Sequence, residues 1–199
     1  MCGFLCIFGP GSDQTENFRF KNLSEALNHR GPDDYGVSIG ANYSTYFWRL
    51  SIVDREMGKQ PMKSYDKTVT LLFNGEIYNY LEIRNQLSED YKFRTVSDTE
   101  TIIAAYKKWG KECFDHFEGM FSIVIIDHKK NKIILSRDLA GVKPMYYFFN
   151  GKNLFISSEY KVFLKSNIVE KRINREALKK YFIFQTIPGK SNLVEGINK

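Results

Sequence analysis

The pattern of apolar and polar residues divides the chain into strand-like and helix-like blocks. The apolar run CGFLCIF predicts a buried strand that ends at Gly9, Pro10 and Gly11. The next strand-like runs are VSIGANYSTYFWRLSIV (37–53) and TVTLLFNGEIYN (68–79). The later runs FSIVIIDH, KIILSRD, MYYFFN and NLFISSE are short, rich in β-branched and aromatic residues, and separated by turn residues. These four runs predict antiparallel hairpins.

Helical spacing of apolar residues marks two segments between the first strands. The segment 16–31 places Phe20, Leu23 and Leu27 at helical spacing and ends in a glycine, so it predicts an amphipathic helix. The segment 81–90, directly after the run TVTLLFNGEIYN, predicts a second helix.

A longer helix is predicted over residues 97–117. One side of this segment is apolar and carries Ile102, Ile103, Tyr106 and Trp109. Either Asp98 or Thr99 can cap its first turn, and the helix should end near Gly119. The segment SEYKVFLK also has a helical pattern.

The order of these elements predicts an α+β fold. Strands and helices do not alternate strictly, as they do in a parallel doubly wound sheet. We therefore expect two antiparallel sheets packed face to face with helices outside. The pattern changes near residue 168, beyond which one short helix and a polar tail are expected, as if a following domain continued from there.

Composition and charge are those of a globular protein with one substantial core. The chain has 199 residues, 43% of them hydrophobic, and a net charge of +6. Its densest cationic group, Lys129, Lys130 and Lys132, lies where a hairpin turn is expected, so a solvated loop is favoured over a nucleic-acid site. No helix-turn-helix, RRM or paired-cysteine zinc motif is present, and we expect no metal site.

The cysteines and the apolar runs favour the cytoplasm. Three cysteines without regular spacing argue against a disulfide framework and for a reducing compartment. Cys6 and Cys113 are expected to be small buried hydrophobes. The first apolar run lacks a basic flank and is too short for a signal peptide, and no run approaches the ~20 apolar residues that span a bilayer.

Cys2 is the first candidate for chemistry. Removal of Met1 would leave Cys2 with a thiol and a free α-amino group, and an amine of pKa ~8 can take the thiol proton. A Cys-His dyad is the competing arrangement, for which His29, His116 and His128 are the candidates. Because His116 and His128 lie on a helix and in a turn with nothing nearby to orient them, the amine is the favoured base.

The stretch FNGEIYNY supplies candidate oxyanion donors. Asn74, Gly75 and Glu76 are expected just past a strand, where a glycine lets a substrate approach closely. The Asn74 amide and a following N–H suit the oxyanion of a tetrahedral intermediate. The alternative is that Asn-Gly only forms a β-turn.

Two charged residues suit an amino-acid ligand. Arg49 lies within an apolar strand pattern, where its guanidinium needs a partner, either a ligand carboxylate bound bidentately or an internal salt bridge. Asp98 is either a helix cap or the partner of a ligand ammonium group.

Nine ordered blocks resemble the N-terminal glutaminase domain of class II glutamine amidotransferases, and most closely the asparagine synthetase (glutamine-hydrolysing) branch. The blocks are MCG, HRGPDDYG, RLSIVD, QPM, FNGEIYN, SDTE, FEGMFSIVIID, RDLAGVKPMYY and SSEYKVF. The resemblance implies the N-terminal nucleophile hydrolase fold, a four-layer αββα sandwich of two antiparallel sheets flanked by helices.

The resemblance also implies roles for particular residues. It assigns Cys2 as the nucleophile with its own amine as the base, and Asn74 and Gly75 as the oxyanion hole. The implied residues that bind L-glutamine are Arg49, Ile52, Val53, Asn74, Gly75, Glu76 and Asp98. Arg49 is expected to bind the α-carboxylate, and the acidic pair Glu76 and Asp98 is expected near the α-amino group. The backbone of Ile52 and Val53, in the same strand as Arg49, is expected to line the pocket. Arg30 is expected to help position the chain terminus, and His29 is not expected to be catalytic.

The implied domain organisation is a glutaminase domain over residues 1–167 and the start of a linker or synthetase domain over 168–199. The Ser-Gly-Gly-x-Asp-Ser phosphate loop of the synthetase is absent from the 199 residues. ATP and Mg are therefore expected only for that other domain, in cis or on a separate subunit, and no cofactor for glutamine hydrolysis. Three alternatives stay open: a sugar or nucleotide precursor as the ammonia acceptor, a non-catalytic binding module, and a homodimer.

Overall fold

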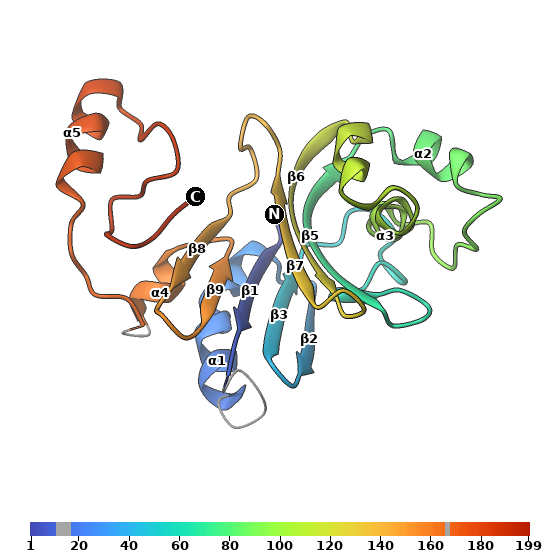
Figure 1. The fold of residues 1–199 in the computed structure, drawn as a ribbon, viewed down its shortest axis with the longest axis horizontal. Helices are drawn as coiled ribbons and strands as arrows, with labels where there is room; N and C mark the ends of the chain where they lie inside the picture. Colours follow the sequence, from blue (N-terminus) through green and yellow to red (C-terminus); the bar gives the residue numbers. More distant parts are fainter. Residues whose placement is uncertain (11–16, 166–167) are drawn as a thin grey trace. The chain divides into compact units, whose positions relative to one another are not determined.

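Figure 1 shows the fold in a computed structural model that describes residues 1–10, 17–165 and 168–199. The chain divides into two compact units. Unit 1 comprises residues 1–2, 30–37 and 47–143, and unit 2 comprises residues 3–29, 38–46 and 144–199.

Unit 1 is built on a four-stranded sheet with the strand order β4-β5-β6-β7. Its strands are β4 (Met62–Lys63), β5 (Val69–Ile77), β6 (Gly119–Asp127) and β7 (Lys132–Arg137). All neighbouring strands are antiparallel, and β5 and β6 pair along their whole length. The β6–β7 hairpin is confirmed, and its turn exposes Lys129 and Lys130 as predicted.

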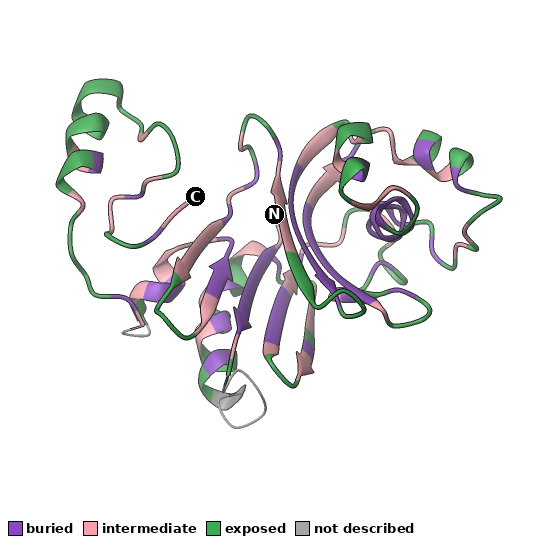
Figure 2. Cartoon of the chain, in the orientation of Figure 1, coloured by how far each residue is buried: buried purple, intermediate pink, exposed green. Residues whose placement is uncertain are grey.

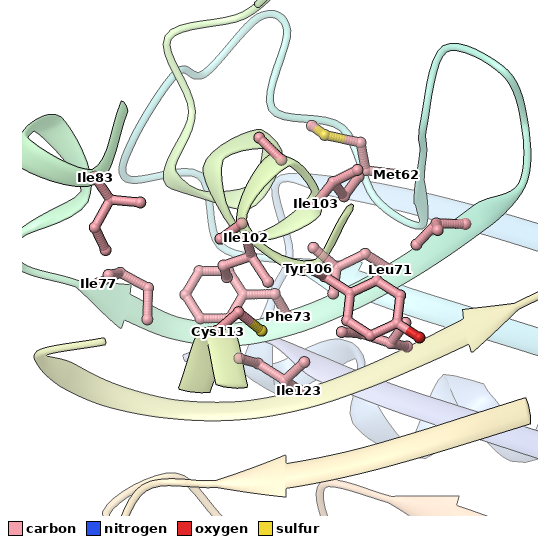
Figure 3. Close-up of a cluster of buried hydrophobic side chains, with 14 of the residues drawn as sticks. Met62, Leu71, Phe73, Ile77, Ile83, Ile102, Ile103, Tyr106, Cys113 and Ile123 are labelled. Carbon is pink, nitrogen blue, oxygen red and sulfur yellow. The ribbon is translucent and has the colours of Figure 1, made fainter. Parts of the chain in front are cut away.

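Alternation along these strands puts the core of unit 1 on one face of the sheet. That face carries every second residue of β5 and β6, including Leu71, Phe73 and Ile123, all of them buried. Figure 3 shows how these side chains meet Ile102, Tyr106 and Cys113 from the helical layer. The other face of the sheet is left for a different set of side chains, which includes Asn74.

The helices that cover this core are α2 (Tyr80–Gln86) and α3 (Asp98–Trp109), which continues as a 3₁₀ helix over Gly110–His116. The cap of α3 is Ser97, whose Oγ accepts a hydrogen bond from the Thr99 N–H. The prediction of Asp98 or Thr99 as the cap is therefore wrong. Asp98 starts the helix, and Figure 2 shows that α3 is largely buried.

The second sheet has five strands in the order β2-β3-β1-β9-β8 and lies mostly in unit 2. Its strands are β1 (Gly3–Phe8), β2 (Asp34–Gly40), β3 (Tyr43–Arg49), β8 (Tyr146–Phe149) and β9 (Leu154–Ser157). β9 pairs antiparallel with both β1 and β8. The helices of unit 2 are α1 (Asn17–Ser24), a 3₁₀ helix (Glu25–Arg30), α4 (Lys161–Lys165) and α5 (Arg175–Phe184).

Some predicted boundaries differ from the structure. The predicted helix over 16–31 is an α-helix only as far as Ser24 and then tightens into a 3₁₀ helix; its first residue, and Gly11 of the predicted strand stop, lie outside the described residues. The predicted run 37–53 contains two strands, and the second ends at Arg49. No helix in the described ranges is long and apolar enough to cross a membrane. The domain boundary near residue 168 stays a prediction.

Candidate active site

The structure brings all eight predicted site residues to one cavity, which lies within unit 1 and has a volume of about 270 Å³. The predicted residues on its wall are Cys2, Arg49, Ile52, Val53, Asn74, Gly75, Glu76 and Asp98. They come from the chain terminus, the end of β3, the loop after it, β5 and the start of α3.

The cavity lies at an open edge of β5. Strand β4 pairs only with Thr70 and Leu71, so the rest of the β5 edge needs other partners. The buried Gln60 side chain takes the place of a strand at Phe73, since its Oε1 accepts from the Phe73 N–H (2.6 Å) and its Nε2 donates to the Phe73 C=O (2.9 Å). Asp98 Oδ2 accepts from the Ile77 N–H at 3.4 Å. Gly75 lies midway between these two points on the same edge.

The backbone of Gly75 faces this edge. Gly75 pairs with Phe121, whose N–H and C=O both bond to Asp138 on the β7 side. Opposed residues in an antiparallel ladder either exchange both bonds or direct both groups away from each other, so the Gly75 N–H points to the cavity side. A Cβ on Gly75 would lie 2.2 Å from the Met120 carbonyl oxygen, so this strand position admits only glycine.

The predicted location of the Asn-Gly pair past a strand is wrong. Asn74, Gly75 and Glu76 lie inside β5, and the close approach of β6 is what demands the glycine. Asn74 is only 1% exposed. Within the described part of the chain its Nδ2 is sealed from solvent and has no hydrogen-bond partner, so this donor is uncommitted.

Cys2 is held by the backbone of Leu50 and the side chain of Arg30. Its Sγ accepts from the Leu50 N–H at 3.4 Å and donates to the Leu50 carbonyl oxygen at 3.6 Å. The Arg30 Nε–H donates to the Cys2 carbonyl oxygen at 2.8 Å, in line with the predicted place of Arg30 beside the chain terminus. Burial raises the pKa of the Cys2 thiol, although the Leu50 N–H and the positive charges of the terminus and Arg49 partly oppose this effect. The thiol therefore needs a nearby base to ionise at neutral pH.

Arg49 is a buried cation without a carboxylate partner among the described residues. Its Nη1 donates to the Arg55 carbonyl oxygen at 2.9 Å, and its Nη2 to those of Val53 (3.1 Å) and Asp54 (2.7 Å). The alternative of an internal salt bridge is thus wrong. These bonds satisfy only part of the guanidinium fork and leave its charge to be balanced by an anion in the cavity.

The same bonds explain why β3 is shorter than predicted. The chain leaves the sheet after Arg49 and wraps around the guanidinium, so Ile52 and Val53 lie in a loop and not in the strand of Arg49. Asp54 fixes this loop, because its carboxylate accepts from the Met57 N–H (3.0 Å) and the Val96 N–H (2.9 Å). Ile52 and Val53 reach the cavity wall through this loop.

Asp98 and Glu76 form an acidic pair on the cavity wall. Burial of Asp98, with a smaller repulsion from Glu76, raises the pKa of the Asp98 carboxyl to about 6. A cation bound beside Asp98 would stabilise the ionised form of this carboxyl. The cavity therefore offers a positive group, Arg49, and a separate negative pair, as an amino-acid zwitterion requires.

Comparison with known protein families identifies the family of the chain. Residues 1–199 match the model of the glutamine amidotransferase domain. The chain belongs to this family.

Named relatives of this amidotransferase domain are asparagine synthetases. It is 36% identical to asparagine synthetase [glutamine-hydrolyzing] 1 of Bacillus subtilis, over 100% of the chain and 32% of the relative. It is 36% identical to a putative asparagine synthetase [glutamine-hydrolyzing] 2 of Methanocaldococcus jannaschii (94% and 40%), and 40% identical to asparagine synthetase [glutamine-hydrolyzing] 1 of Arabidopsis thaliana (81% and 28%). The chain thus spans about a third of the length of these relatives.

Solved structures confirm the fold class. The amidotransferase domain matches the glutamine phosphoribosylpyrophosphate amidotransferase from B. subtilis complexed with ADP and GMP, with a TM-score of 0.67, 19% identity, and coverage of 83% of this chain and 44% of the other. An allosteric regulatory enzyme of purine biosynthesis matches with a TM-score of 0.66, 18% identity, and coverage of 83% and 43%. At this identity the match concerns the fold alone, and the predicted α+β architecture with two antiparallel sheets is confirmed.

The sequence did not place seven further residues on the cavity wall. They are Met1, Leu50, Gln60, Phe73, Thr99, Met120 and Lys143, of which Lys143 is a buried cation. All of them lie in the blocks quoted above, but nothing in a linear pattern shows that Gln60 would replace a strand or that Lys143 would turn inward.

The three histidines of the amidotransferase domain lie elsewhere. His29 Nε2 is 2.9 Å from Glu159 Oε1, His116 stacks on Trp109, and His128 Nε2 is 2.8 Å from Thr70 Oγ1. None lines the cavity, so the Cys-His alternative has no support in this geometry. In the described ranges, no group of three or more His, Cys, Asp or Glu side chains could hold a metal ion.

Proposed function

We propose that this domain hydrolyses the side-chain amide of L-glutamine to glutamate and ammonia through a thioester on Cys2. One observation carries the proposal: a single cavity is lined by the thiol, by a buried guanidinium without a carboxylate partner in the described chain, and by an acidic pair. A free amino acid with an electrophilic side chain fits these three features together.

The charges orient the substrate. The Arg49 guanidinium binds the α-carboxylate, and Glu76 with Asp98 binds the α-ammonium group. The backbone of Ile52 and Val53 closes the loop side of the pocket. The glutamine side chain then extends toward Cys2, with its carboxamide oxygen at the Gly75 N–H and the Asn74 amide.

The reaction balances with water as the only co-reactant. The α-amine of a mature Cys2 takes the thiol proton, and the thiolate attacks the carboxamide carbon. The C–N bond of the tetrahedral intermediate breaks, and ammonia leaves with the proton that the amine carries. The amine then takes a proton from water, the hydroxide attacks the thioester, and glutamate leaves as Cys2 recovers its proton.

Removal of Met1 is the test of this mechanism. With Met1 attached, the Cys2 nitrogen is an amide without basicity, so we expect a preparation that retains Met1 to release no ammonia from glutamine, and one that begins at Cys2 to be active. Intact-mass measurement of each preparation, paired with an ammonia assay, decides this. Strong activity in a sample that fully retains Met1 would contradict the amine as base.

Alkylation separates an enzyme from a binding module. A diazoketone analogue of glutamine should label the Cys2 thiol of the mature protein once, and the Cys2→Ala variant not at all. Cys6 and Cys113 serve as internal controls, because burial raises the pKa of both thiols. Glutamine binding without labelling would support the non-catalytic alternative.

We further propose that the domain supplies ammonia to a synthetase that converts aspartate to asparagine. The support is the names of the relatives and the share of their length that the chain spans. ATP and Mg would act in that other part, in cis or on a separate subunit. A phosphate-binding loop in the downstream coding sequence is the observation that tests this, and an acceptor-binding domain for a sugar or nucleotide precursor in its place would favour the alternative.

The cytoplasm is the compartment that we propose. All three cysteines are free, as suits a reducing environment. Cell fractionation tests the compartment, and light scattering of the purified protein tests homodimer formation.

A further inference from the structure

Three buried polar atoms without a partner lie in a row across β5, β6 and β7. Among the residues that the structure describes, these atoms are Asn74 Nδ2, Ser122 Oγ and Arg137 Nε. Asn74 is directly opposite Ser122 in the β5–β6 ladder, and Ser122 is directly opposite Arg137 in the β6–β7 ladder. Directly opposed residues point to the same face of a sheet with Cβ atoms about 5 Å apart, so the three side chains are neighbours.

Such a row is unusual in a folded protein. Buried polar atoms nearly always have a partner, because an unpaired one costs the free energy of its desolvation. Ser122 is fully buried in β6, between Phe121 and Ile123, where an alanine would fit the sheet equally well. The hydroxyl therefore calls for an explanation, and its neighbour Asn74 lies on the wall of the cavity.

A hydrogen-bond chain that leaves Asn74 Nδ2 free for a ligand can run in only one direction. The Arg137 Nε–H can only donate, whereas a serine hydroxyl accepts and donates at the same time. If Ser122 Oγ accepts from Arg137, its own O–H must donate onward, and Asn74 can receive that bond only at Oδ1. Asn74 then has Nδ2 left over, on the side of the amide away from Ser122. The Arg137 guanidinium is already anchored at one end, since its Nη2 donates to the Gly141 carbonyl oxygen at 2.9 Å.

We propose that Ser122 is a positioning residue for the Asn74 carboxamide. None of these bonds is formed in the structure. When the oxyanion forms, a half-turn of the amide about its Cβ–Cγ bond turns Oδ1 toward Ser122 and the N–H toward the oxyanion, and a rotation of Ser122 about its Cα–Cβ bond lets Oγ accept from Arg137 and donate to Oδ1. The positive charge at the far end of the chain polarises the amide, which makes Nδ2 a stronger donor. The inference rests on the proposed function, since it assigns a role in the same reaction. Ser122 does not line the cavity, so it acts through Asn74 and not on the substrate.

The substitution Ser122→Ala in the full-length protein with a mature Cys2 terminus tests this role. We expect kcat for glutamine hydrolysis to fall roughly tenfold, the worth of one buried hydrogen bond, with KM unchanged. Thermal stability of the ligand-free protein should be equal or higher, because in that state the hydroxyl is buried and unpaired. A merely structural serine would instead lower stability and leave kcat alone. Ser136→Ala is the matched control, since Ser136 pairs with Ile123 on the opposite face of the same sheet, and it should leave kcat and KM as they are.

A double-mutant cycle decides whether the effect passes through Asn74. In an Asn74→Ala background, Ser122→Ala should cause no further loss of kcat, because the group that it positions is already absent. Full additivity of the two losses, or an unchanged kcat in Ser122→Ala alone, would overturn the assignment. These results are distinct from a failure of the proposed function, in which the parent protein with a mature Cys2 would release no ammonia from glutamine.

Discussion

At the scale of single residues, the cavity is defined by charged groups that lack an opposite charge among the described residues. Arg49 donates three hydrogen bonds to its own loop but contacts no carboxylate in that part of the chain, and Asp98 is buried beside another acid. Both arrangements destabilise the empty fold and are relieved by a zwitterionic ligand. Stability and binding are thus opposed at these positions.

Asp98→Asn should separate the two effects. Since folding raises the pKa of Asp98 from 3.8 to about 6, the cost of ionising this carboxyl at pH 7 is about 3 kcal/mol. The contribution of the protonated Asp98 carboxyl to the free energy of unfolding is complete below pH 3.8 and is lost as the pH rises through about 6. We therefore expect Asp98→Asn to be more stable than the parent at pH 7, by up to about 3 kcal/mol in urea unfolding, and to lack this loss of stability between pH 4 and 7.

The same variant should bind glutamine more weakly. Loss of the anion proposed to face the α-ammonium group should raise KM by one to two orders of magnitude, with a smaller change in kcat. Glu76→Gln removes the repulsion and should shift the stability change of the parent to lower pH, and it should also raise KM, because Glu76 belongs to the same proposed pair. A gain in stability at pH 7 without a rise in KM would contradict the role of Asp98 in binding.

At the scale of elements, the edge of β5 decides where the cavity lies. Strand β4 is too short to cover this edge, and the Gln60 side chain continues the ladder at Phe73. Beyond that point the edge is open as far as Asp98, which leaves the Gly75 N–H free to face a ligand. A side chain in place of a strand thus sets the geometry of the proposed oxyanion site.

Gln60→Leu tests the importance of the hydrogen bonds between the Gln60 side chain and the Phe73 backbone. The variant leaves the Phe73 N–H and C=O buried without partners, which should cost about 1–3 kcal/mol for each group. We expect a lower melting temperature in calorimetry and a loss of kcat larger than the change in KM, since Gly75 is two residues away. Gln86→Leu, on the exposed side of α2, is the matched control and should leave both unchanged. An active, destabilised Gln60→Leu protein would show that the edge is structural only.

The elements also show what local sequence can predict. Periodicity alone gives β5 to β9 and the core face of α3, because alternation and helical spacing are imposed by burial on one face. It fails at β3, which ends early because the Arg49 guanidinium draws the following loop around itself, and at α3, where Ser97 takes the cap. Asn-Gly looks like a turn in sequence, yet Gly75 lies in a strand because the Met120 carbonyl of β6 approaches it. The miss at Gly75 depends on a contact between residues far apart in the sequence, whereas those at β3 and α3 depend on local side-chain hydrogen bonds that periodicity does not register.

At the scale of the whole molecule, the eight predicted site residues come from four separate stretches of one compact unit. Residues as distant as Cys2 and Asp98 reach the same cavity only in the folded chain. The eight residues could be named in advance from motifs, whereas Gln60, Lys143 and the Ser122 row could not, because their roles depend on burial and register. The motifs predict residues that are proposed to contact a ligand, and the structure adds the residues that hold those side chains in place.

The extent of the chain leads to the last prediction. The 199 residues span about a third of the asparagine synthetases that they resemble and contain no Ser-Gly-Gly-x-Asp-Ser loop. The groups proposed to hydrolyse glutamine all lie in residues 2–98, and none of the proposed steps uses a nucleotide. We therefore expect the mature chain alone to release ammonia from glutamine at the same rate with and without ATP, Mg and aspartate, and to form no asparagine. Ammonia, ADP or AMP, and asparagine measured in one reaction mixture check this. Nucleotide consumption linked to turnover would mean that the energetic coupling assigned to a separate domain resides in this chain.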